Sequence, residues 1–185
     1  FCTGEATIVN VTRAITVNEE SICNATGVTF VELLAGYEVL AFVSNSNLTF
    51  GQCLSTANID ALLAPTAIQN TTWSAVFPED TDETELAVFL PQPNTITYAL
   101  LDNEVNGFGF RSDARTLADD AAVLSAVAET SGALGIVRLA SIPDDADVNV
   151  LEVRNNEINQ CIAPDSDSIS DGAYAVGTPL YSYIN

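Results

Sequence analysis

Short apolar runs alternate with helical patterns along the chain, and this alternation restricts the fold more than any other feature. Strands are predicted where β-branched or apolar residues run for five or six positions, at 6–11, 29–34, 38–43, 86–90, 134–139, 148–153 and 179–184. Helices are predicted at 18–25, 55–63, 95–103 and 119–129, where acidic or hydroxyl residues open a segment with helical spacing. Strands that alternate with helices are typical of the α/β class.

The charge balance excludes several classes of partner. The chain has 25 acidic residues, five basic residues and no histidine, for a net charge of −20. Nucleic acids and anionic lipids are recognised by clustered Lys and Arg, so neither is an expected partner. The acidic excess fits a role in solubility. Two acidic runs, at 79–83 and 144–147, suggest calcium as an alternative, but they lack the spacing of an EF-hand loop and no metal site is predicted.

The absence of histidine excludes the commonest kinds of catalytic site. A Ser-His-Asp or Cys-His site cannot be built, and the commonest general base and metal ligand is missing. We therefore predict that the chain is not an enzyme and uses no cofactor. No apolar stretch approaches the roughly 18 to 20 residues that a membrane span requires.

Cysteines and sequons indicate an oxidising compartment. The four cysteines (Cys2, Cys23, Cys53 and Cys161) are not spaced as zinc ligands, and their even number suits two disulfides. Four Asn-x-Thr sequons allow glycosylation, at Asn10, Asn24, Asn47 and Asn70. An extracellular, cell-surface or periplasmic location is the corresponding prediction.

Several motifs, taken in order, resemble the phosphate-binding subfamily of type II solute-binding proteins, which serve ABC importers. Residues 1–15 read Phe-Cys-Thr-Gly-Glu-Ala-Thr-Ile-Val-Asn-Val-Thr-Arg-Ala-Ile, similar to the family stretch Phe-Cys-x-Gly-Glu-x-Asp-Ile-x-x-x-Ser-Arg-Pro-Ile. Residues 35–45 resemble the strand that crosses toward the second lobe. Cys53-Leu-Ser-Thr, Trp73, Gly-Ala-Leu-Gly-Ile at 132–136 and Asp-Gly-Ala-Tyr-Ala-Val-Gly-Thr-Pro-Leu-Tyr at 171–181 follow in the expected sequence.

The resemblance implies a two-lobed α/β fold of the type II periplasmic-binding-protein kind, with an incomplete first lobe. Residues 1–40 would form part of the first lobe, 41–140 the second lobe, and 141–185 would return through the hinge to the first. The order of the motifs implies disulfides between Cys2 and Cys23 and between Cys53 and Cys161.

The resemblance also implies an anion site built from hydroxyls, backbone amides at helix starts and arginines. The corresponding residues here are Thr12, Arg13, Asn94, Thr95, Thr97 and Arg111. The family loop Asp-Ser-Gly-Thr is replaced by Asn94-Thr95-Ile96-Thr97, so a β-branched residue stands where glycine would let a ligand approach the backbone. Thr95 could instead cap a helix, and each arginine could instead pair with a nearby carboxylate.

Two functions are consistent with these features. The first is an extracytoplasmic domain that binds phosphate or a related oxyanion between its lobes. The alternative is a degenerate copy of the fold that serves as a structural or interaction module in a cell-surface protein or assembly. The family's first Gly-Ser-Thr loop has no counterpart in the sequence, so the edge of the first-lobe sheet near 6–11 is expected to be covered by another chain or segment.

Overall fold

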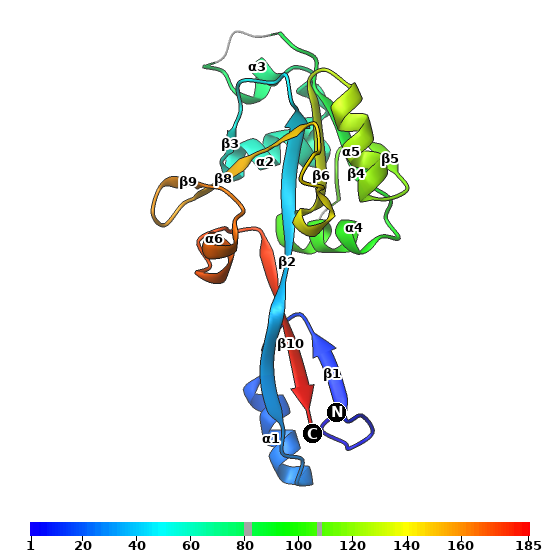
Figure 1. Ribbon diagram of the computed structural model, residues 1–185, viewed down its shortest axis with the longest axis vertical. Helices are drawn as coiled ribbons and strands as arrows, with labels where there is room; N and C mark the ends of the chain where they lie inside the picture. The colour runs from blue at the N-terminus through cyan, green and yellow to red at the C-terminus, as the bar shows by residue number, and fades with distance from the viewer. Residues whose placement is uncertain (80–82, 107–108) are drawn as a thin grey trace. The chain divides into compact units, whose positions relative to one another are not determined.

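The computed structural model describes residues 1–79, 83–106 and 109–185, and the side chains of 105 and 106 are not described. The acidic run at 79–83 therefore falls mostly outside the described residues. The chain forms two compact units (Figure 1). Unit 1 consists of Phe1–Glu38 and Thr178–Asn185, and unit 2 of Val39–Gly177. Residues 141–177, which the sequence placed on the return path, pack in unit 2, because their strands pair there with β2 (Val31–Asn45) and β3 (Cys53–Leu54).

Unit 1 is a small antiparallel sheet with one helix. It holds β1 (Ile8–Val11), α1 (Val17–Thr26), the first half of β2 (Val31–Asn45) and most of β10 (Gly177–Ile184). β10 pairs with β1 on one side and neighbours β2 on the other. Thr16 caps α1 by accepting from the amide of Glu19, and Gly27 ends it with a φ of 76°. The Cys2–Cys23 disulfide ties the start of the chain to α1.

Unit 2 is a sheet packed with helices. Its strands are β4 (Ala87–Pro91), β5 (Arg115–Leu117), β6 (Ala133–Arg138), β7 (Val148–Val150) and the second half of β2. A smaller sheet contains β3 (Cys53–Leu54), β8 (Glu152–Asn155) and β9 (Gln160–Ile162), and the Cys53–Cys161 disulfide joins β3 to β9. The helical segments are α2 (Thr56–Leu63), η1 (Pro65–Gln69), α3 (Trp73–Val76), α4 (Ile96–Leu101), the π-helical turn η2 (Asp102–Asn106), α5 (Asp120–Glu129), η3 (Leu139–Ser141) and α6 (Ser166–Ser170).

The core of unit 2 lies on both faces of its main sheet. Val43, Phe89 and Val137 meet α5 on one face, whereas Leu40, Phe42 and Ile136 meet α2 and α3 on the other. Strands buried on both faces carry continuous apolar runs, which is the pattern that predicted β4 and β6. None of the described helices is long and apolar enough to cross a membrane.

Two sequence predictions of strands were wrong in detail. The runs at 29–34 and 38–43 are one continuous strand, β2, because β10, β6 and β7 pair with it along its length. The single strand expected at 148–153 is two strands in different sheets. β7 pairs with β2 and β8 pairs with β3, and between them Leu151 donates its amide to the carbonyl of Phe42 at 2.8 Å. In both cases pairing with distant strands set the boundaries.

Candidate functional site

The residues predicted to bind an anion lie in both units. Thr12 and Arg13 follow β1 in unit 1, whereas Asn94, Thr95, Thr97 and Arg111 belong to unit 2.

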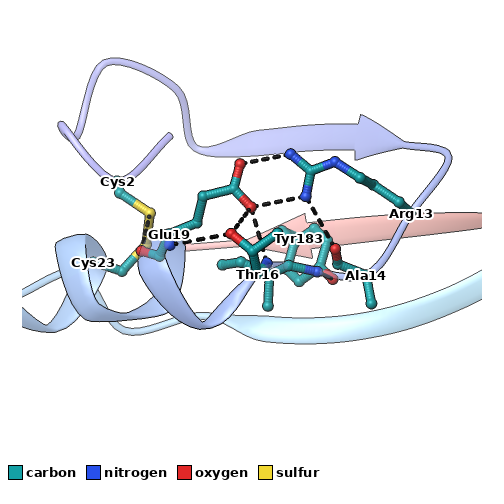
Figure 2. A network of polar contacts seen from close by, with 8 residues as sticks. Cys2, Arg13, Ala14, Thr16, Glu19, Cys23 and Tyr183 are labelled. Carbon is teal, nitrogen blue, oxygen red and sulfur yellow. Dashed lines mark hydrogen bonds and ion pairs between the residues drawn. A yellow bond between two sulfur atoms is a disulfide. The ribbon is translucent and has the colours of Figure 1, made fainter.

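Arg13, in the segment between β1 and α1, forms an ion pair with Glu19 in the first turn of α1, as Figure 2 shows. Nη2 donates to Oε1 of Glu19 at 2.6 Å and Nη1 donates to Oε2 at 2.8 Å. Glu19 also accepts from the amide and the hydroxyl of Thr16, so its carboxylate completes the α1 cap. Hydrogen bonds from Arg13 and then from Thr16 lower the pKa of Glu19. This geometry supports a structural role for Arg13, and its role as a ligand stays a prediction.

Thr95 and Thr97 stand at the start of α4, directly after β4. The Thr95 hydroxyl accepts from the amide of Tyr98 at 3.2 Å and donates to the carbonyl of Gln92 at 2.7 Å, which makes it the N-cap. Thr97 is buried, and its hydroxyl donates to a carboxylate oxygen of Asp120 at 2.7 Å. Asn94 is exposed beside them.

Asp120 is a buried carboxylate in the first turn of α5 and accepts from three residues. Besides Thr97, it accepts from the hydroxyl of Ser141 at 2.7 Å and from Arg138, through the backbone amide at 3.3 Å and through Nε at 3.2 Å. Burial by itself would raise the pKa of Asp120, but the hydrogen bonds from Thr97, Ser141 and Arg138 together outweigh burial, and the pKa is lowered. A buried carboxylate with this many donors is held ionised and rigid.

These groups surround a hollow of about 310 Å³ on the surface of unit 2. Its lining consists of Thr95, Ile96, Thr97, Asp119, Asp120, Ala121, Arg138 and Ser141. Both helix starts open on it, since Thr95 caps α4 and Asp119 caps α5. Helix starts carry unpaired N–H groups and a partial positive charge, which favour anions. Arg138 adds a side chain that is 34% exposed.

The sequence did not predict that Asp120, Arg138 and Ser141 belong to a site. The sequence pattern indicates only an acidic helix start at Asp120 and only a strand at Arg138. In the sequence, Asp120 lies 18 positions from Arg138 and 21 positions from Ser141. The one available signal was the small number of basic residues. With five arginines and 25 acidic residues in the chain, each arginine is expected to pair with a carboxylate.

Arg111 is buried, and its guanidinium bonds three residues of unit 2. Its Nε and Nη2 donate to the two carboxylate oxygens of Asp113 at 2.7 and 2.8 Å. The guanidinium also donates to the carbonyls of Leu62, at 3.2 Å, and Asn70, at 3.1 Å. A guanidinium has five N–H donors, and these contacts use most of them to join the end of α2 to the loop before β5. The arrangement supports a structural role.

The four sequons differ in accessibility. Asn10, Asn24 and Asn47 are exposed, whereas Asn70 is half-buried and its side-chain amide donates to the carbonyl of Ala61 at 2.8 Å.

Glu152 lies beside the sulfurs of Cys53 and Cys161, but these sulfurs form a disulfide and are not available as metal ligands.

A family model described as a PBP superfamily domain matches residues 1–185. Two curated relatives are proteins named SphX. The one from Synechococcus elongatus is 24% identical over 192 residues, and the one from Synechocystis is 25% identical over 190 residues. Each match covers 100% of this chain, but 55% and 56% of the relatives. The chain therefore spans about half the length of these curated relatives.

Two solved structures share the fold of this chain. A possible phosphate binding protein from Planctomyces limnophilus has a TM-score of 0.83 and 24% identity, with 100% of this chain and 66% of that chain covered. PstS from Borrelia burgdorferi has a TM-score of 0.73 and 16% identity, with 97% and 67% covered. These likenesses confirm the α/β fold expected from the sequence.

Proposed function

Because the chain belongs to the PBP superfamily domain family, we propose that it is an extracytoplasmic solute-binding module that binds phosphate or a related oxyanion. One structural relative, from Planctomyces limnophilus, is a possible phosphate binding protein, which supports this ligand class. The two disulfides support an oxidising compartment. Its role would be to hold the anion for a membrane importer or a sensor, without catalysis.

The hollow at the starts of α4 and α5 is the observation that carries the proposal. An oxyanion there would meet N–H groups of two helix starts and the guanidinium of Arg138. Asp120 holds Arg138 in place through Nε, and the side chain is still one-third exposed to a ligand. Asn94, which directly precedes Thr95, is the further candidate donor on this surface.

The same hollow contains groups that oppose an anion. Asp119 and Asp120 both line it, and Arg138 is the only basic residue among its lining residues. The carboxylate of Asp120 is satisfied by Thr97, Ser141 and Arg138, and Asp119 accepts from the amide of Ala122 at 2.9 Å. These partners lower the repulsion but do not remove it. We therefore expect weak binding, with a Kd of about 1 mM, or about −4 kcal/mol.

Calorimetry with inorganic phosphate at constant ionic strength tests the proposal. Arg138→Gln should weaken binding about tenfold, since a hydrogen bond to a charged group is worth about 1.5–3 kcal/mol. Arg154→Gln is the matched control, because Arg154, on β8, donates to the side chain of Asn159 and does not line the hollow. If the unmodified protein binds no phosphate at millimolar concentrations, the proposal fails and the structural or interaction role becomes the better one.

A further inference from the structure

The hydroxyl groups that line the hollow at the starts of α4 and α5 all donate within the protein. The hydroxyl of Thr95 donates to a backbone carbonyl at 2.7 Å. The hydroxyls of Thr97 and Ser141 both donate to Asp120, each at 2.7 Å. Asp120 accepts on both carboxylate oxygens, because Oδ1 bonds Thr97 and Oδ2 bonds Ser141 and Arg138. These side chains therefore have no hydroxyl proton to give to a ligand.

Two charged groups of the hollow still have atoms to offer. Arg138 bonds Asp120 through Nε at 3.2 Å, and its two Nη groups have no partner within the described ranges. Asp119 accepts from the amide of Ala122 through Oδ1 at 2.9 Å, and its Oδ2 has no partner in the same part of the chain. Asp119 is exposed. The hollow thus presents one cationic and one anionic group to a ligand.

The two groups act in opposite directions on a ligand that is only anionic. Arg138 attracts it, whereas Asp119, which has no basic partner among the described residues, repels it. The charge of Asp120 is offset by its bond to Arg138. The sign of a Coulomb energy follows the product of the two charges, so a positive group placed at Asp119 changes that repulsion into attraction. A ligand with both charges satisfies both groups.

The hollow also has room and apolar surface for a linker between two charged groups. Its volume of about 310 Å³ lies at the lower end of the roughly 300–1,000 Å³ that is typical of sites for small organic molecules. Ile96, which is 64% exposed, and Ala121 line it. A short alkyl chain would cover part of Ile96 and remove apolar surface from water. Ile96 obstructs a bare oxyanion but offers a contact to a ligand with an alkyl chain.

We propose that this hollow binds a small phosphate or phosphonate that also carries a cationic amine. The anionic group lies at the Nη groups of Arg138, and the amine lies at Oδ2 of Asp119. The inference rests on the proposed function, since it uses the same hollow, and it narrows the related oxyanion to a zwitterionic one. Asp119 is then the residue that determines specificity, because its charge favours the amine-bearing ligand over the bare anion.

Calorimetry with three ligands at constant ionic strength tests the proposal. The ligands are inorganic phosphate, n-propyl phosphate and O-phosphoethanolamine, and the last two differ in that a methyl group replaces the ammonium group. O-phosphoethanolamine should bind about fivefold more tightly than n-propyl phosphate, which corresponds to one exposed ion pair of about 1 kcal/mol. The preference should shrink as salt is added, because exposed charges are screened.

Asp119→Asn should abolish the preference and leave the helix intact. Asparagine caps helices as well as aspartate does, so the start of α5 keeps its cap while the charge is removed. The two organic ligands should then bind equally. Asp165→Asn is the matched control, since Asp165 is the exposed N-cap of α6 and does not line the hollow. It removes the same charge from the protein and should keep the fivefold preference.

The outcomes separate this inference from the proposed function. If none of the three ligands binds at millimolar concentrations, both fail. If the two simple anions bind and O-phosphoethanolamine binds no more tightly than n-propyl phosphate, the zwitterionic ligand is overturned and phosphate binding stands. A preference that persists in Asp119→Asn would overturn the role of Asp119. Sedimentation with phosphatidylethanolamine vesicles distinguishes the sources of this chemistry. A soluble ligand predicts no binding to vesicles, and vesicle binding that Asp119→Asn abolishes would identify a lipid headgroup instead.

Discussion

The hydroxyl of Thr97 donates a 2.7 Å hydrogen bond to Asp120, which joins the first turns of α4 and α5 through two side chains 23 positions apart. Both residues are buried. The bond fixes the spacing of the two helix starts that open on the proposed anion site. Predictions about this site therefore depend on Asp120 as much as on the threonines.

Asp120→Asn should change the acid stability of the protein. The pKa of Asp120 is lowered in the folded state, so its contribution is complete above the ordinary carboxyl pKa of about 3.9 and is lost as the pH falls through the lower folded value. Asp120→Asn should lower the free energy of unfolding by about 1–3 kcal/mol at pH 7 and by less at pH 2.5. Urea unfolding across this pH range measures the difference. Asp60→Asn, at an exposed position on α2, is the control.

Ile96→Gly should strengthen phosphate binding. Ile96 is 64% exposed and lines the hollow at the start of α4, where its side chain stands between solvent and the backbone. Removing it lets an anion oxygen reach an amide, and one such bond corresponds to about a tenfold lower Kd. Calorimetry compares the variant with Ile158→Gly, at an exposed position outside this hollow. A micromolar Kd in the unmodified protein would contradict the expectation that Ile96 obstructs the site.

Arg111→Gln separates a structural role from a ligand role. Arg111 is 3% exposed and bonds Asp113, Leu62 and Asn70. Breaking a buried pair costs about 3–5 kcal/mol, and the expected loss here is about 3 kcal/mol because the side chain of Asp113 is half-exposed. Chemical denaturation should show this loss, whereas the phosphate Kd of the folded variant should stay unchanged. A variant of normal stability that no longer binds phosphate would restore Arg111 as a ligand.

Gly132→Ala should destabilise the protein much more than Gly172→Ala. The two glycines have φ values of 68° and 70°, so the conformational cost of a side chain, about 1–2 kcal/mol, is shared. A Cβ at Gly132 would lie 2.1 Å from the carbonyl oxygen of Glu85, whereas nothing lies within 4 Å of one at Gly172. Relief of this clash would also disturb the 2.8 Å bond from Trp73 Nε1 to the Gly132 carbonyl. We expect a loss of about 3 kcal/mol or more for Gly132→Ala by urea unfolding.

Removal of each disulfide should cost stability, and the cost should rise with the logarithm of the length of the loop that the disulfide closes. The Cys2–Cys23 bond has a sequence separation of 21 and the Cys53–Cys161 bond one of 108. Chain-entropy arguments give about 3 kcal/mol for the first and about 5 kcal/mol for the second. Paired Cys→Ala variants in urea unfolding measure both values. Non-reducing peptide mapping should recover these two pairs, and a Cys2–Cys161 peptide would contradict them.

The sequence by itself determined the local elements of this protein. Helix starts at Ser55 and Asp119 and the buried strands β4 and β6 follow from side chains within a few positions of one another, since caps and hydrophobic periodicity act at short range. The ordered motifs likewise carried the family resemblance.

Tertiary structure alone decided how the charged residues are paired and where strands continue. Arg138 forms its ion pair with Asp120 and not with another carboxylate, and Arg111 is buried. β2 continues through Gly36 as one strand. In a chain with 25 acidic residues, every arginine has many possible partners in sequence. Ion pairs and strand pairing depend on which distant segments the fold brings within a few ångströms, and no short-range pattern encodes that choice.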